Sequence, residues 1–272
     1  MAEIHSQTGF LEAQGAPLYY EVAGQGDPLL LLHAGIADNH MWDEQFPEFA
    51  RHYRTIRYDL RGYGQSPFPT GPFANYEDPA ALLASLGIEK AHVVGVSFGG
   101  KIALDFALAH PEMVTSLVLV ATSVGGAQPS ELMQHFFTEE EAALERGDVE
   151  GATELNLRMW VDGPRRKPEQ VNPLVRKQVY DMLYPVIAVP QPEGADEIGL
   201  HPPAITRLAE IRVPTLLVVG DYDIPHMLTL TRQLADQIGG AQQVIIPGVA
   251  HMVNMEQSEE FTRVVLRFLS EL

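Results

Sequence analysis

The segment at residues 95–100, Gly-Val-Ser-Phe-Gly-Gly, constrains the fold of this chain more than any other part of it. An apolar, β-branched run precedes it at residues 91–94, and apolar residues at helical spacing follow it as far as Pro111. A serine on a sharp turn from strand to helix has its hydroxyl pushed clear of the backbone, and flanking glycines avoid collisions there. The G-x-S-x-G pattern in this context predicts a nucleophile at Ser97, whereas the alternative is a glycine-rich turn that only joins two elements.

Eight segments are predicted to form strands: residues 8–11, 18–22, 29–33, 54–58, 91–94, 116–121, 214–220 and 243–246. The first two predict a hairpin with Gly15, Ala16 and Pro17 in its turn. Helical patterns alternate with the later strands, at residues 42–51, 79–86, 101–108, 227–238 and 259–269. The alternation, with strands that are apolar throughout, predicts an α/β fold whose mostly parallel sheet is covered by helices on both faces.

The alternation stops between Thr122 and about Pro203, where no strand-like run occurs. Helical patterns fill this interval at residues 139–147, 152–160 and 171–183. A helical block inside an α/β pattern is most simply an insertion over an edge of the sheet. We therefore expect a core formed by residues 1–122 and 204–272 and a helical cap, or lid, formed by residues 123–203.

Composition argues against several classes of function. The 272-residue chain has a formal net charge of −18, which repels nucleic acid and anionic lipid, so neither is an expected partner. It contains no cysteine, which removes disulfides and thiol catalysis. No run reaches the ~18 apolar residues of a membrane span, and no secretory signal is visible, so a cytoplasmic location is expected. No His-x-His or His-Glu-x-x-His spacing occurs, and no metal or organic cofactor is expected.

A serine hydroxyl needs a base, and the base needs an orienting group. The sequence supplies candidates after the last two predicted strands, where the carboxyl ends of parallel strands gather active residues. His251 follows a glycine-containing loop after the last strand. Asp223 lies three residues past Gly220, at the end of the preceding strand, and is favoured as the acid over Asp221. The order Ser97, Asp223, His251 is the one expected for a nucleophile on such a turn.

Negative charge that develops on the substrate oxygen needs backbone donors. The amide of Phe98 lies at the predicted start of a helix, where it can donate to such a charge. Residues 33–36, His-Ala-Gly-Ile, follow the third strand, where a second amide is usually supplied. Gly35 suits a loop that approaches a ligand closely, although the amides of its neighbours are alternatives.

Five motifs together resemble those of the α/β-hydrolase family. They are His-Ala-Gly at residues 33–35, Asp-Leu-Arg-Gly-Tyr-Gly-Gln-Ser at 59–66, the Ser97 turn, Gly-Asp-Tyr-Asp at 220–223 and Gly-Val-Ala-His at 248–251. The resemblance covers nearly the whole chain, with the helical block in the place of the family's cap. It is greatest to the carboxylesterase and 3-oxoadipate enol-lactonase-like group, through residues 41–42 and 157–164. It implies an eight-stranded α/β-hydrolase fold, Asp223 as the acid, and an oxyanion hole formed by the amides of Gly35 and Phe98.

The expected function is hydrolysis of a small-molecule carboxylic ester, with a short to medium acyl group, or of a lactone through an acyl-enzyme. A C–C bond hydrolase, a cofactor-free perhydrolase and a hydrolase-like ligand receptor without turnover are alternatives with the same triad. Candidate pocket residues are Ile36, Met41, Trp160 and Met252, then Met159, Phe136, Phe137 and Tyr184, although such side chains usually pack in the core. A dicarboxylate lactone would want a basic partner, and Arg158, Arg165 and Arg166 are candidates that are more simply solvated.

Overall fold

A single sheet organises the chain, as seen in a computed structural model that describes residues 6–272. Residues 1–5, on which the expectation about a secretory signal rests in part, lie outside the described residues. The eight strands have the order β1-β2-β4-β3-β5-β6-β7-β8. They span Gln7–Ala13 (β1), Ala16–Ala23 (β2), Pro28–Leu32 (β3), Arg54–Tyr58 (β4), Ala91–Val96 (β5), Val114–Val120 (β6), Thr215–Gly220 (β7) and Gln242–Ile246 (β8). Strand β2 is antiparallel to β1 and β4, and all other pairs are parallel.

The central strands are apolar on both faces because both faces are covered. All six residues of β5 and all six of β7 are buried. Side chains that alternate along β3 enter two different core clusters, with Leu30 and Leu32 on one face and Leu29 and Leu31 on the other. A strand buried on both sides has no position for an exposed polar residue, which explains the continuous hydrophobic runs in the sequence.

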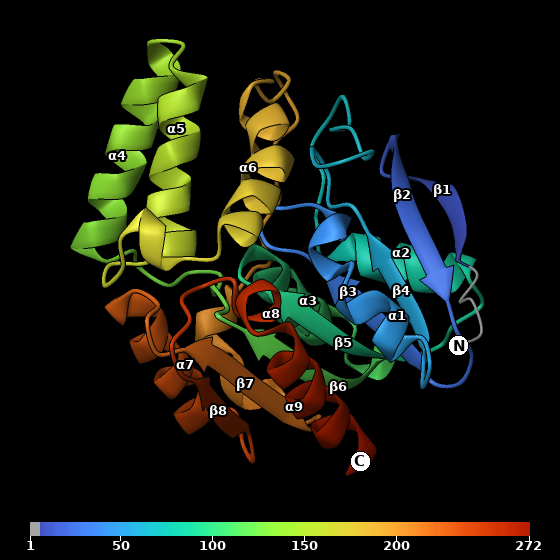
Figure 1. The fold of residues 1–272 in the computed structure, drawn as a ribbon. Helices are drawn as coiled ribbons and strands as arrows, with labels where there is room; N and C mark the ends of the chain where they lie inside the picture. Colours follow the sequence, from blue (N-terminus) through green and yellow to red (C-terminus); the bar gives the residue numbers. More distant parts are fainter. Residues whose placement is uncertain (1–5) are drawn as a thin grey trace.

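Helices cover both faces of this sheet (Figure 1). Helices α2 (Glu77–Ser85), α3 (Phe98–Ala109) and α7 (Pro225–Gln237) pack into the first core cluster, whereas α1 (Gln45–Phe49) and α9 (Ser258–Ser270) pack into the second. The predicted α/β-hydrolase architecture is therefore confirmed. Shorter helical turns occur at η1 (Asn39–Trp42), η2 (Pro111–Met113), η4 (Pro168–Gln170), η5 (Ala204–Thr206), η6 (Leu208–Glu210) and α8 (Val253–Glu256). No helix within residues 6–272 is both long and apolar enough to cross a membrane.

The opening hairpin turns one residue earlier than the sequence predicts. Its turn is Gln14–Gly15, and Ala16 and Pro17 already pair with β1. Gln14 has φ 50° and Gly15 has φ 80°. A two-residue turn with positive φ at both positions matches the twist of the flanking strands, and Pro17 cannot take part because its ring fixes φ near −65°.

Three helices stand together above the sheet in Figure 1: α4 (Glu131–Glu145), α5 (Val149–Asn156) and α6 (Pro173–Ile187). Helix α4 begins eight residues before the predicted start because the Ser130 side chain accepts a hydrogen bond from the Met133 amide. The predicted helix at residues 152–160 ends instead in a π-helical turn, η3 (Leu157–Asp162). The predicted helix at residues 42–51 is shorter, since only η1 and α1 form there.

Candidate active site

Ser97 lies on a strained turn between β5 and α3. Its φ of 54° and ψ of −111° lie outside the usual regions for a residue with a side chain. The Ser97 amide donates to the Val120 carbonyl over 2.8 Å, which ties the turn to β6. A side chain at Gly99 would collide with the carbonyl oxygens of Leu32 and His33. This close packing explains why the G-x-S-x-G pattern needs its second glycine.

Asp223 and His251 form a buried hydrogen-bonded pair beyond the ends of β7 and β8. Asp223 Oδ2 lies 2.8 Å from His251 Nδ1, and the two side chains are 1% and 2% exposed. The other carboxylate oxygen, Oδ1, accepts the Ile224 amide over 2.7 Å. Because an ionised carboxylate only accepts hydrogen bonds, the proton between the two side chains is on Nδ1. The imidazole therefore presents Nε2 as an acceptor.

The second candidate acid, Asp221, has a different partner. Its Oδ1 accepts the Gly248 amide over 2.6 Å, so it braces the loop that leads to His251 and does not contact the imidazole. Within residues 6–272, the Ser97 hydroxyl makes no hydrogen bond to His251. Such contacts are often long without substrate and tighten when it binds.

The loop after β3 leaves specific backbone amides free for a ligand. The Ala34 amide donates to Met41 Sδ over 3.1 Å, and the Ala37 amide closes a turn onto the Ala34 carbonyl. In the described chain, the amides of Gly35 and Ile36 have no such partner. An added Cβ on Gly35 would lie 3.3 Å from the Phe98 Cβ, so Gly35 lies directly against the first residue of α3. The loop amide of Gly35 and the amide of Phe98, the first residue of α3, therefore belong to neighbouring residues.

His33 braces this loop, a role that the sequence did not reveal. Its Nε2 accepts the Leu60 amide over 2.9 Å, and Nδ1 lies 2.8 Å from the Ala34 carbonyl. Since Nε2 accepts, Nδ1 carries the proton and donates. Complete burial lowers the pKa of His33, against the opposing effect of the nearby Asp59 carboxylate. A neutral imidazole with two hydrogen bonds therefore links the loop after β3 to the loop after β4. The position of His33 directly after a buried strand was the one sequence feature that pointed to this role.

Trp160 connects the cap to His251. It lies in η3, and its ring centroid is 4.7 Å from that of His251. Phe136 of α4 packs edge-on against the same indole at 5.7 Å. π-Helical turns often occur at functional sites because they re-aim side chains. Here the turn places the indole of Trp160 against the imidazole of His251, with the two ring planes tilted by 45°.

The other candidate pocket residues are distributed differently. Ile36, Met41 and Met252 are 8%, 2% and 0% exposed and belong to a core cluster. Met159 and Phe136 line a cavity of about 210 Å³ together with Ile224, the residue after Asp223. Phe137 and Tyr184 are exposed.

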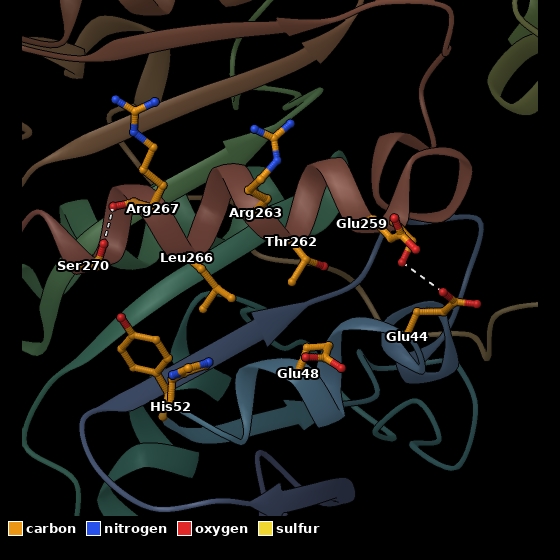
Figure 2. A pocket seen from close by; sticks show the side chains of 11 residues that line it. Glu44, Glu48, His52, Glu259, Thr262, Arg263, Leu266, Arg267 and Ser270 are labelled. Carbon is orange, nitrogen blue, oxygen red and sulfur yellow. Dashed lines mark hydrogen bonds between the residues drawn. The ribbon is translucent and has the colours of Figure 1, made fainter. Parts of the chain in front are cut away.

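A groove larger than this cavity lies away from these residues. It has a volume of about 740 Å³ and runs between α1 and α9. Figure 2 shows Thr262 and Leu266 of α9 pointing towards α1, while Arg263 and Arg267 point away. None of Ser97, Asp223 or His251 lines it. The volume of a groove is therefore a poor guide to the candidate active site in this protein.

Two of the three clustered arginines at residues 158–166 form ion pairs within the protein. Arg158 pairs with Glu154 over 3.0 Å, and Arg166 pairs with Glu256 over 2.5 Å. Arg165 is exposed and lies 5.9 Å from the centre of the Tyr222 ring. The group of three or more ligating side chains that a metal ion would need is absent from residues 6–272.

A sequence model of the α/β hydrolase fold matches residues 27–258, and this chain belongs to the α/β-hydrolase fold family. The family resemblance found in the sequence is thereby confirmed. Proline iminopeptidase of Lactobacillus helveticus is 27% identical over 97% of this chain and 97% of its own. A solved hydrolase structure from Pseudomonas aeruginosa is 30% identical, with a TM-score of 0.77 over 96% of this chain and 98% of that one. The structure of an enzyme described as degrading N-acyl homoserine lactones is 26% identical, with a TM-score of 0.76 over 96% of this chain and 100% of the other.

Proposed function

We propose that this protein is a serine hydrolase that cleaves small carboxylic esters or lactones. The observation that carries the proposal is the buried hydrogen bond of 2.8 Å between Asp223 and His251. It leaves Nε2 of the imidazole as a base, on the side away from the carboxylate. The strained turn at Ser97 supports the same function, because it sets a hydroxyl clear of the backbone at the end of β5.

In the proposed mechanism, Ser97 Oγ attacks the carbonyl carbon of the substrate and Nε2 of His251 takes the hydroxyl proton. The carbonyl oxygen becomes an oxyanion that accepts hydrogen bonds from the amides of Gly35 and Phe98. One such donor contributes roughly 3 kcal/mol to transition-state stabilisation. His251 then delivers the proton to the leaving alcohol as the C–O bond breaks. Water repeats the sequence on the acyl-enzyme and releases the acid.

The surroundings of the pair favour an uncharged substrate. Trp160 presents aromatic surface next to His251, and Phe136 packs against Trp160. Arg166 is buried and paired with Glu256, whereas Arg158 is paired with Glu154 at the surface and Arg165 is exposed. The aromatic surface supports a short to medium, apolar acyl or alcohol group.

A Ser97→Ala variant tests the proposal. We expect it to lose ester hydrolysis, because the proposed acyl-enzyme forms on the Ser97 hydroxyl. Ser85→Ala is the matched control, since the Ser85 hydroxyl donates to the Leu82 carbonyl on α2. Rates on p-nitrophenyl acetate and butyrate measure the effect. Retention of full activity by Ser97→Ala would exclude this mechanism.

A substrate panel separates the proposed class from its alternatives. It comprises p-nitrophenyl esters of increasing acyl length, an acyl homoserine lactone, an enol-lactone, a proline amide and a meta-cleavage product. We expect the greatest kcat/KM on a short ester or a lactone. A greater value on the amide would indicate a peptidase, and on the meta-cleavage product a C–C hydrolase. Tight binding without turnover on the whole panel would indicate a receptor.

A further inference from the structure

One ion pair joins the cap to the loop that carries His251. Arg166 Nη1 lies 2.5 Å from Glu256 Oε2, and Nη2 lies 3.0 Å from Oε1. The two side chains are 7% and 5% exposed. The two residues are 90 positions apart in the sequence. Arg166 follows the π-helical turn η3, and Glu256 lies at the end of α8. A bidentate pair of this kind fixes direction as well as distance.

Arg166 also binds three backbone carbonyls. Its Nε donates to Asp162 over 2.9 Å and its Nη2 to Val161 over 2.8 Å, at the end of the turn that carries Trp160. Its Nη1 reaches the Gly248 carbonyl over 3.3 Å, in the loop before His251. One guanidinium therefore holds the Trp160 turn and the histidine loop together.

Glu256 completes the connection from the other side. Its Oε1 accepts the amide of Ala250, the residue before His251, over 3.0 Å. The cap packs closely at this point, because a Cβ on Gly163 would lie 2.6 Å from the Tyr222 carbonyl oxygen and 2.9 Å from the Ala250 Cβ. The loops that carry the acid and the base are thus both in contact with the end of the same cap turn.

We propose that the Arg166–Glu256 pair is a positioning element for His251. The pair holds the loop before His251 and the π-helical turn that carries Trp160 in one fixed arrangement. The inference rests on the proposed function, in which His251 is the base. Arg166 does not touch the reacting atoms and acts through the backbone it holds. Its loss releases the loop that carries the imidazole, which lowers kcat more than it changes KM.

Three variants separate positioning from stability. Arg166→Met leaves Glu256 buried without its partner, which destabilises the fold. Arg166→Met/Glu256→Gln removes both charges, yet a glutamine oxygen still accepts the Ala250 amide. Arg165→Met is the matched control, since it removes an equal charge from the adjacent, exposed residue. Each variant is measured for kcat and KM on p-nitrophenyl butyrate and for Tm.

We expect kcat to fall between about tenfold and a hundredfold in both Arg166 variants, with KM little changed. Tm should fall in the single variant and recover in part in the double variant, which still lacks the bonds from Arg166 to three backbone carbonyls, while kcat does not recover. Arg165→Met should retain both. If kcat returned with Tm to within about twofold of the wild type in the double variant, the pair would be only structural and the proposal wrong.

A second readout does not depend on turnover. The Nδ1 proton between His251 and Asp223 gives a far-downfield proton resonance, assigned by its absence in His251→Ala. We expect this resonance to broaden in both Arg166 variants and to be retained in Arg165→Met. An unchanged resonance in both would contradict the positioning role. Absence of ester hydrolysis in the wild-type protein would instead contradict the proposed function and leave this readout interpretable.

Discussion

Asp223→Asn is the substitution whose effect the structure predicts in most detail. It keeps the shape of the side chain and removes its charge. The Ile224 amide donates to Asp223 Oδ1, so the asparagine carbonyl must take that position. The asparagine NH₂ then faces His251 Nδ1 across the former 2.8 Å hydrogen bond. Two donors cannot share that bond, so Nδ1 must become an acceptor and the ring proton must move to Nε2.

An imidazole protonated on Nε2 cannot accept the proton of Ser97. The loss of the correct tautomer in a comparable triad lowers kcat about 10⁴-fold, which corresponds to about 5.4 kcal/mol in activation free energy. We expect a fall of this order for Asp223→Asn. Stability should change much less, because the asparagine makes both hydrogen bonds with the proton relocated.

The assay compares kcat on p-nitrophenyl butyrate for wild type, Asp223→Asn and Asp221→Asn. Asp221 is the matched control, because an asparagine there still accepts the Gly248 amide and never contacts the imidazole. We expect Asp221→Asn to retain most of the activity. If Asp223→Asn stayed within about tenfold of the wild type, the tautomer argument would be refuted.

Two further predictions concern stability. Arg61 and Asp78 form an ion pair of 2.7 Å with side chains 0% and 1% exposed, so Asp78→Asn should lower the free energy of unfolding by about 3–5 kcal/mol. In urea titrations Asp181→Asn is the control, because its pair with Lys177 is exposed and should contribute less than about 1 kcal/mol; equal effects of the two would contradict the burial argument. His33 has a pKa lowered by burial from its ordinary value of 6.5, so the unfolded chain binds more protons below that pH. Stability should therefore fall as pH drops below 6.5 through the pKa of His33 in the folded protein. His33→Gln should weaken this dependence of Tm on pH, measured between about pH 7.5 and about pH 5. An unchanged dependence of Tm on pH in the variant would show that His33 does not titrate in this way.

Local chemistry explains the parts of the fold that the sequence predicted well. The strand at Arg54–Tyr58 has the predicted limits, because its β-branched residues Thr55 and Ile56 and the aromatic Tyr58 favour a strand. The cap helices were predicted less well at their ends. The start of α4 depends on Ser130 as a cap, and the end of α5 depends on a π-helical turn that has no distinctive composition.

The sequence by itself determined the strand-turn-helix around Ser97 and the chain order of Ser97, Asp223 and His251, since glycine spacing and hydrophobic runs act over a few residues. Tertiary structure decided that His251 pairs with Asp223 and that Asp221 binds Gly248. It also decided that Arg166 holds Glu256 across 90 positions. These pairings depend on how the loops after β7 and β8 pack against each other and against the helical segment of residues 123–203. No local pattern of residues encodes contacts between segments so far apart in the sequence.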